Sequence, residues 1–387
     1  MIDHADVVVI GGGIVGTAAT YFLSKFGAEV FLVDRGSIAS GTSGAGEGNL
    51  IVSNKHPGPE MELGKLAMKT WADLVEELPV DLEYEQKGSL LFTDTEDGAD
   101  ALAERVKIVE AEGIEGYLMD RQQMRECEPY LTEAVTGVAL FPGDAQVQPM
   151  LACWAMADAA RANGAVIETQ SEVTAIEQDT HGAVMGVVTS HGKIATRTVV
   201  NAAGPWSPSI GKMVGMEIPV RPRRGHIIVT EAAPKIVRHK AMEASYTQTI
   251  DTAVDDLQVA CVVEDTKSGT LLLGSSREFV GFDKNLRLDA IQRIVQRAIR
   301  FFPVLSKLNA IRAYIGFRPY TPDHKPILGV CESVPGFYLA TGHEGGGICL
   351  GPITGKLIAQ LLTGQDLDLS LEPYLLKRFG TTVYMQH

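Results

Sequence analysis

The glycines near the start of the chain have the spacing of a dinucleotide-binding turn. Gly11-Gly12-Gly13-Ile14-Val15-Gly16 follows the apolar run at 7–10, precedes an alanine-rich helical stretch, and is answered by Asp34 after a second apolar run. Gly11 would permit the tight turn, Gly13 would let the backbone approach a pyrophosphate, and Gly16 would let the helix pack on the strand. The helix N-terminus favours phosphate, and the acid can bind a ribose. The pattern predicts a dinucleotide site; a ligand-free glycine turn is the alternative.

Composition favours a globular enzyme-sized protein. The chain has 387 residues, of which 45% are hydrophobic and 21% charged, so we expect either two domains or one large domain carrying an insertion. No apolar run approaches the length of a membrane-spanning helix, and the first residues show no secretion signal. We therefore expect a cytoplasmic protein, and association with the inner membrane through electron-accepting partners is left open.

Charge and cysteine spacing exclude other classes. The formal net charge of −14 disfavours nucleic acid as a partner. The five cysteines lie far apart and form no C-x-x-C pair, so we predict buried reduced thiols and no metal site.

The order of elements predicts an α/β fold, α+β overall. Strand 7–10, helix 14–26 and strand 30–33 form a βαβ unit, and this predicts a parallel sheet. Further helices are expected at 59–78, 99–112 and 149–163, with strands at 89–93 and 165–168 and a meander of strands at 172–176, 184–190 and 193–200. Between 215 and 308 we expect several strands and one helix (289–302), which predicts an antiparallel cap. Near the C-terminus, strand 337–341, glycine bend 342–347 and helix 353–362 repeat the strand, glycine turn and helix order of the N-terminus. We predict that 1–85, 143–214 and 311–387 form a Rossmann-like nucleotide domain, and that 86–142 and 215–310 form a substrate domain.

Four segments together resemble a known family. They are the turn with its acid (11–34), Gly41-Thr42-Ser43-Gly44, Asn201-Ala202-Ala203-Gly204-Pro205-Trp206, and Gly342-His343-Glu344-Gly345-Gly346-Gly347. Their order resembles the glycine oxidase, sarcosine oxidase and D-amino-acid oxidase family of FAD-dependent enzymes, whose fold is glutathione-reductase-2-like. The segment 44–49 and the His343-Glu344-Gly345 bend look most like the β subunits of heteromeric bacterial dehydrogenases acting on opines, D-hydroxyproline or glycine, the last of the hydrogen-cyanide-forming type.

The resemblance implies non-covalent FAD and assigns its contacts. The adenosine would lie at Asp34 and Arg35 with Val173 at the adenine, and the pyrophosphate on the first glycine turn. The late bend would face the pyrimidine end of the flavin. Trp206 is equally a candidate core aromatic. The full set of implied cofactor-binding residues is Gly11, Gly13, Ile14, Val15, Gly16, Asp34, Arg35, Thr42, Ser43, Gly48, Asn49, Leu50, Val173, Ala203, Gly204, Trp206, Gly342, Gly345, Gly346, Gly347 and Ile348.

Two departures from the sarcosine oxidase pattern favour a dehydrogenase. The flavin-tethering cysteine aligns with Arg318, and the oxygen-activating lysine aligns with Leu272. Without that cation a superoxide intermediate is less stabilised. The resemblance then implies an α subunit as electron acceptor, with FMN at the shared interface and a small iron–sulfur subunit as further possibilities.

The family residues that hold the substrate carboxylate are also missing, since they fall near Asn49 and at Cys349. Arg318, Arg277 and Tyr246 are candidates for that role, each with an ordinary strand or surface position as the alternative. Glu47 and Glu344 could face a cationic group of the substrate or simply be solvated, and His343 could tune protonation or be structural.

The predicted reaction is hydride transfer from the α-carbon of an amino acid to flavin, followed by hydrolysis of the imine. We rank opines first, then D-hydroxyproline or another imino acid, then glycine or sarcosine. The alternatives are an oxidase that forms hydrogen peroxide, a nicotinamide-reducing flavoprotein, for which a second glycine fingerprint is missing, and a non-catalytic flavin-holding relay subunit.

Overall fold

A parallel sheet organises the nucleotide-binding part of the chain. The computed structural model describes residues 4–246, 254 and 256–380. Its first sheet has six strands, all parallel except the edge strand β18. In spatial order they are β18 (Ile327–Val330), β19 (Phe337–Thr341), β12 (Val199–Asn201), β1 (Val7–Ile10), β2 (Val30–Val33) and β8 (Val166–Glu168).

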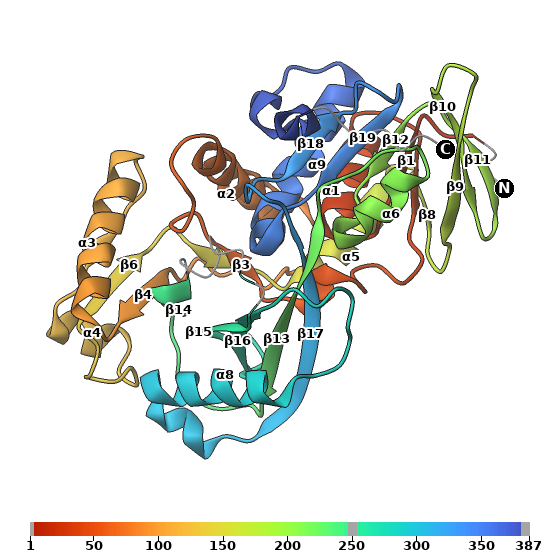
Figure 1. Cartoon of the computed structure of the whole chain (residues 1–387). Helices are drawn as coiled ribbons and strands as arrows, with labels where there is room; N and C mark the ends of the chain where they lie inside the picture. Colours follow the sequence, from red (N-terminus) through yellow and green to blue (C-terminus); the bar gives the residue numbers. More distant parts are fainter. Residues whose placement is uncertain (1–3, 247–253, 255, 381–387) are drawn as a thin grey trace.

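Helices cover one face of this sheet and a small sheet covers the other (Figure 1). The helical layer is α1 (Ile14–Lys25), α2 (Pro59–Glu77), α5 (Pro149–Ala162) and α9 (Gly347–Thr363). The other layer is the antiparallel sheet β9 (Val173–Gln178), β10 (Val184–Thr189) and β11 (Gly192–Ala195), with α6 (Ser207–Lys212). The predicted βαβ unit and parallel sheet are confirmed.

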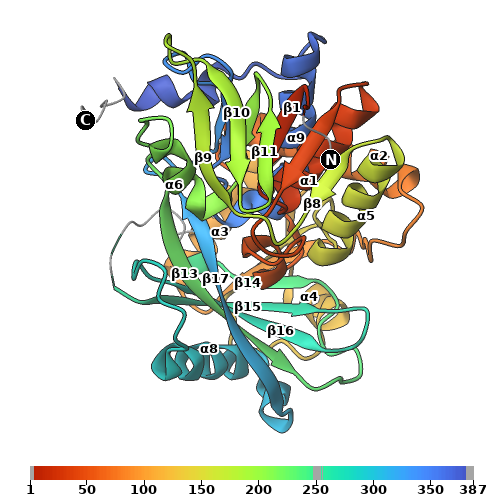
Figure 2. The same ribbon diagram turned by 90° about the vertical axis from the view of Figure 1, so that its right-hand side faces the viewer.

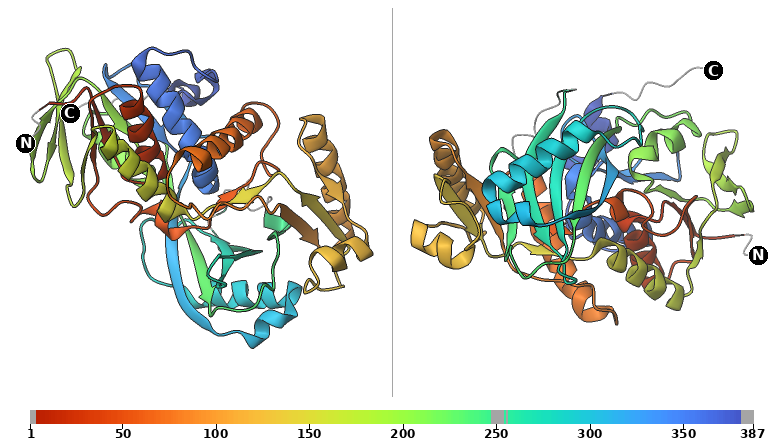
Figure 3. Two further views of the ribbon diagram at one scale, coloured as in Figure 1. Left: turned by 180° about the vertical axis from the view of Figure 1, so that it is seen from behind. Right: turned by 90° about the horizontal axis from the view of Figure 1, so that it is seen from below.

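The second large sheet forms the predicted cap. It has eight strands and one parallel pair, β14 with β4, among antiparallel neighbours. In order they are β17 (Ala310–Tyr320), β13 (Arg221–Thr230), β16 (Leu271–Arg277), β15 (Gln258–Asp265), β14 (Lys240–Glu243), β4 (Ser89–Thr93), β6 (Gly137–Phe141) and β5 (Tyr117–Leu118). Helix α8 (Leu288–Phe301) lies across one face (Figure 3), with α3 (Glu96–Ala111) and α4 (Arg121–Cys127) at the far end of the sheet.

Short elements connect the two parts. The ribbon of β3 (Asn49–Leu50) and β7 (Ala145–Gln146) runs between the sheets, and the long pair β13 and β17 reaches from the nucleotide-binding part to the far side of the cap (Figure 2). Single 3-10 turns are η1 (Thr42–Ala45), η2 (Gly204–Trp206), η3 (Pro303–Lys307), η4 (Glu344–Gly346), η5 (Glu372–Tyr374) and η6 (Leu376–Phe379).

Three sequence predictions need correction. The run 193–200 is two strands in different sheets, because Thr196 breaks it by accepting a hydrogen bond from the N–H of Thr198 (3.1 Å). Helix α9 begins at Gly347 rather than at residue 353, since it tolerates Pro352 in its second turn at the loss of one N–H donor. Strand β17, assigned by the boundary at residue 311 to the nucleotide domain, pairs with β13 in the cap, and its own sequence does not reveal that partner.

All five cysteines are free and four are buried, as predicted. Within the described ranges no helix is long and apolar enough to cross a membrane.

Candidate functional site

The first glycine turn has the geometry that close backbone approach requires. Gly11 has a φ of +115°, and a Cβ there would lie 2.5 Å from the carbonyl oxygen of Ala202. A Cβ on Gly16 would lie 1.8 Å from the Gly11 carbonyl oxygen, so this glycine sets the distance between α1 and the turn. The carboxylate of Asp34 closes the turn by accepting from the N–H groups of Gly12 (2.6 Å) and Gly36 (2.7 Å).

A central cavity joins the first glycine turn to the late bend. Among the predicted cofactor residues it is lined by Gly11, Gly13, Ile14, Val15, Asp34, Thr42, Ser43, Asn49, Ala203, Gly204, Trp206, Gly345, Gly347 and Ile348. All four predicted catalytic residues, Glu47, Tyr246, Arg318 and His343, also line it. The cap side of the cavity is completed by Gly225, Ile227 and Pro319. Sequence reasoning missed these residues, and the only sequence feature that indicates them is the alternation of side chains along β13 and β17.

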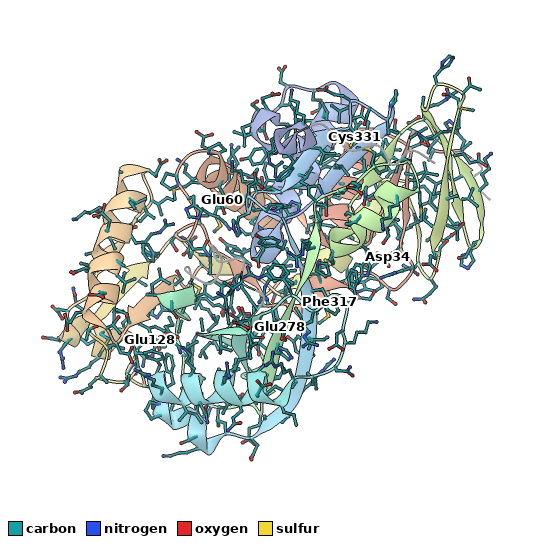
Figure 4. The ribbon with its side chains drawn as sticks, in the orientation of Figure 1. Asp34, Glu60, Glu128, Glu278, Phe317 and Cys331 are labelled. Carbon is teal, nitrogen blue, oxygen red and sulfur yellow. The ribbon has the colours of Figure 1, made fainter. Side chains whose placement is uncertain are left out.

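An outer groove continues the central cavity past Asp34. Arg35 and Val173 line it, together with Asp34 and Phe317, which are labelled in Figure 4. The two hollows share Gly11, Asp34, Gly41, Thr42, Ala45, Ala203, Trp206 and Gly316. An extended ligand can therefore run from the late bend, past the glycine turn, to Val173.

Five predicted cofactor residues line neither hollow: Gly16, Gly48, Leu50, Gly342 and Gly346. Gly48 instead lies against β7, where a Cβ would come 1.7 Å from the Val147 carbonyl oxygen, and Leu50 is fully buried in that ribbon. Their neighbours Glu47 and Asn49 do line the cavity, so a place for Gly48 and Leu50 beside the flavin ring stays a prediction.

The side-chain hydroxyls of Thr42 and Ser43, which follow the second strand, form hydrogen bonds to other segments of the protein. Thr42 donates to the carbonyl oxygen of Phe317 (2.6 Å) and so ties η1 to β17. The oxygen of Ser43 accepts from the N–H of Ile14 at the start of α1 (2.9 Å). Both residues also line the central cavity, so these hydrogen bonds fix the position of part of the cavity wall.

Trp206 connects the two parts of the chain. Its ring stacks on Phe282 of the cap at 5.3 Å between centroids and 9°, and the Arg35 guanidinium lies 4.6 Å from the ring centroid. Trp206 lines both the central cavity and the outer groove, so it forms part of the wall of the site and is not simply a core aromatic.

Three buried or half-buried arginines surround Glu344. Its carboxylate lies 3.5 Å from Arg223 and 3.5 Å from Arg277, and Arg318 is close to the neighbouring Gly345. Burial alone would raise the pKa of the Glu344 carboxyl, but the three guanidiniums lower it to about 2. Glu344 is thus an ion-paired anion and is not solvated.

Arg223, Arg277 and Arg318 form the arginine cluster, and Arg318 and Tyr246 lie on its cavity side. One N–H of Arg318 donates to the Ser276 carbonyl oxygen (2.9 Å), which fixes the plane of the guanidinium. The ring of Tyr246 lies under the Arg277 guanidinium, 4.4 Å from carbon to centroid. Burial and the like charge of Arg277 lower the pKa of Arg318, a strain that an anionic ligand would relieve.

His343 is buried and neutral. Its Nε2 lies 2.9 Å from the Thr354 hydroxyl oxygen, and burial together with Lys55 lowers its pKa to about 3. A group that stays neutral down to this pH does not take up a proton at physiological pH, so the geometry favours a hydrogen-bonding role over a titrating one.

The free energy of unfolding is therefore expected to fall as the pH decreases from about 6.5 to 4. In that window the unfolded imidazole of His343 takes up a proton and the folded one, with its pKa near 3, does not. One such group contributes a slope of up to about 1.4 kcal/mol per pH unit. Urea unfolding at pH 7, 6, 5 and 4.5 should show a shallower dependence for His343→Asn than for the wild type, and equal dependences would contradict the assignment.

A second buried charge group lies on the other side of the cavity. Lys240, 1% exposed, bridges the carboxylates of Glu264 (2.8 Å) and Glu47 (3.3 Å), and Glu47 also accepts from the amide of Asn49 (3.0 Å). Burial would lower the pKa of Lys240, but the two carboxylates raise it, so the lysine stays charged. Sequence reasoning missed Lys240 and Glu264, which only the strand pairing of β14, β15 and β16 brings behind Glu47.

The hollows fit FAD. Glycines stand where a side chain would collide with the backbone, an acid stands beyond the second strand, and the late bend supplies a second helix start at Gly347. A parallel sheet with such a turn, joined to a largely antiparallel sheet across a long cavity, is the architecture of a flavin-dependent oxidoreductase.

Comparison with known proteins agrees with the assignment to the flavin-dependent oxidoreductases. Residues 6–361 match the family described as DAO, FAD dependent oxidoreductase, and the chain belongs to this family. It is 28% identical to the glycine oxidase of Geobacillus kaustophilus and 30% identical to the hydrogen cyanide synthase subunit HcnC of Pseudomonas protegens, with 98% of each chain covered in both cases. The solved glycine oxidase structure from Geobacillus kaustophilus has a TM-score of 0.89 at 27% identity, covering 97% of this chain and 99% of that one. FAD is the cofactor, and with Arg318 in place of a tethering cysteine it is bound non-covalently.

Proposed function

We propose that this FAD-dependent enzyme oxidises the α-carbon of an amino acid or N-substituted amino acid to an imine, which water then hydrolyses, and passes the electrons to a partner subunit. The arginine cluster in the cavity wall carries the proposal. A fixed guanidinium presents two parallel N–H donors to a carboxylate, and among the residues that the structure describes Arg318 donates to the Ser276 carbonyl oxygen alone. The substrate carboxylate would lie against Arg318, with Arg277 and Tyr246 behind it.

The relatives support a CH–NH or CH–NH₂ donor. The relatives that match over nearly the whole of this chain include a glycine oxidase, a hydrogen cyanide synthase subunit and the human mitochondrial sarcosine dehydrogenase. When bound, FAD supplies the two-electron acceptor for the α-hydrogen. The chain itself positions the carboxylate and keeps His343 neutral, and because the α-hydrogen leaves as a hydride no strong base is needed at the α-carbon.

The electron acceptor is proposed to be a partner chain. The relative HcnC is named a subunit, which supports a hetero-oligomer with an α subunit. FMN at that interface and a small iron–sulfur subunit are parts of the same proposal. Leu272, at the position of the oxygen-activating lysine, is half-buried in β16, and the nearby Lys240 is paired with two carboxylates.

Replacing Glu47 by glutamine is expected to raise the rate at which O₂ reoxidises the reduced enzyme by about tenfold. The change removes one negative charge from the cavity wall and leaves Lys240 with one carboxylate, so a superoxide anion is better stabilised. Stopped-flow mixing of photoreduced FAD-loaded enzyme with O₂ measures this rate. Glu104, which pairs with Lys107 on the exposed face of α3 (3.4 Å), offers the matched control Glu104→Gln, and an unchanged rate in Glu47→Gln would contradict the role of Glu47.

The proposed function is tested by anaerobic spectroscopy of the FAD-loaded chain. Opines, D-hydroxyproline, other imino acids, glycine and sarcosine are added in turn, with and without an electron-accepting dye. Bleaching of the flavin by one of them supports the proposal. Bleaching by NADH alone, or by none of these compounds, would overturn it, the last result favouring a non-catalytic relay subunit. In a separate aerobic assay, rapid peroxide formation from O₂ without a dye or partner would instead support an oxidase.

A further inference from the structure

A second, smaller hollow opens from the central cavity beside the late bend. This side chamber is bounded by Asn54, Lys55, Glu60 and His324, and it shares Asn49 and Tyr246 with the central cavity. Glu60, labelled in Figure 4, is the lining residue that comes from the first turn of α2. A ligand held on the arginine cluster therefore has Tyr246 beside it and the side chamber directly beyond.

The side chamber is lined by buried polar atoms that have no hydrogen-bond partner among the described residues. Within the described residues, the buried Oδ1 of Asn54, Nδ1 of His324 and Oδ1 of Asn49 have no partner. For Asn49 the identity of the free atom is fixed, because its Nδ2 donates to Glu47 (3.0 Å). Buried polar atoms normally find partners, so three of them around one hollow indicate a group that supplies hydrogen-bond donors.

The charges around the side chamber are already compensated. Lys55 lies 3.4 Å from the carboxylate of Glu60, and Glu344 is paired with the arginine cluster. A charged group entering here would lose its hydration without gaining a new counter-ion, whereas a neutral polar group would not. The volume of about 40 Å³ is about three times the minimum for one water molecule, which limits the guest to a few atoms.

We propose that the side chamber is a specificity subsite for a neutral hydroxyl or carboxamide group carried by the substrate. The inference rests on the proposed function, because the substrate carboxylate on Arg318 directs the rest of the molecule toward Tyr246 and the chamber. The donor of the guest hydrogen-bonds to Asn54, and His324 completes its contacts. Substrates without such a group leave these atoms unpaired and are oxidised less efficiently.

The test compares pairs of substrates that differ by one neutral polar group. The FAD-loaded chain is given D-proline and D-4-hydroxyproline, and D-norvaline and D-glutamine as the carboxamide pair, with dye reduction as the readout. In at least one pair we expect kcat/KM to be about tenfold or more higher for the polar member. In Asn54→Leu, which keeps the size of the side chain, the ratio should fall toward one while kcat/KM for the apolar member stays the same.

Binding without turnover separates the inference from the proposed function. Tetrahydrofuran-2-carboxylate and its 4-hydroxy derivative cannot be oxidised at nitrogen, and their affinities follow from the change they cause in the flavin absorbance. Tighter binding of the hydroxy compound, lost in Asn54→Leu and kept in the exposed control Asn163→Leu, supports the subsite even if no amino acid reduces the flavin. Flavin reduction with equal efficiency for both members of each pair, and equal affinities for the two analogues, overturns the subsite alone and leaves the chamber to water.

Discussion

Replacing Arg318 with methionine is expected to lower kcat/KM for the amino-acid substrate by about 10²-fold or more. The loss of a buried, charge-assisted contact to a carboxylate is worth roughly 3 kcal/mol, and each 1.4 kcal/mol is a factor of ten. Methionine keeps an unbranched apolar chain in the space beside Gly225, where the guanidinium now lies. The effect should appear mainly in KM, measured by anaerobic flavin reduction over a range of substrate concentrations.

The controls for Arg318 separate binding from folding. FAD content and thermal unfolding of Arg318→Met should stay near those of the wild type, and Arg318→Lys should recover part of the loss, because a lysine offers the charge without the bidentate fork. Arg312 lies on the same strand, β17, with its side chain exposed, so Arg312→Met should change nothing. An Arg318→Met enzyme with normal KM would show that the carboxylate is held elsewhere.

The nucleotide-binding half could be predicted from sequence because its signals are local. The positive φ of Gly11, the close packing at Gly16 and the acid after β2 all lie within 24 residues, and each depends on residue type at a fixed spacing. The bend at 342–347 is likewise a strand, a turn and a helix start in one short segment. In this segment the predicted helix begins at residue 353, six residues after the observed start of α9 at Gly347.

The arginine cluster could be predicted only in part because strand register builds it. Arg223 on β13 pairs directly with Arg318 on β17, and Gln258 on β15 pairs with Arg277 on β16. These residues are nearly 100 positions apart at the extremes, and a shift of one residue in either strand would turn the side chains to the other face. Arg318 and Arg277 are candidates from the sequence because the family residues that hold the substrate carboxylate are missing, whereas Arg223 is not among those candidates. The same holds for Lys240 and Glu264 behind Glu47.

Replacing Gly16 with alanine is expected to yield protein without its FAD absorbance, with at least a hundredfold rise in the dissociation constant for FAD. A Cβ at this position would lie 1.8 Å from the Gly11 carbonyl oxygen and 3.4 Å from the Ala202 side chain. The atom it strikes is backbone, so α1 must move away from the turn, and the helix N-terminus then leaves the pyrophosphate position. The flavin spectrum after dialysis and fluorescence titration with FAD measure the change.

The matched control for Gly16→Ala is a substitution at Gly143. Like Gly16, Gly143 has an ordinary φ, but unlike Gly16 it has no atom within 4 Å of an added Cβ. Gly143→Ala should bind FAD as the wild type does. If Gly16→Ala is colourless yet unfolds cooperatively and keeps its far-ultraviolet circular dichroism, the defect lies in the turn, because the cap and the rest of the parallel sheet do not depend on that contact. A yellow Gly16→Ala protein with wild-type affinity would mean that α1 can shift without disturbing the cofactor, and the glycine turn would then not be what positions the pyrophosphate.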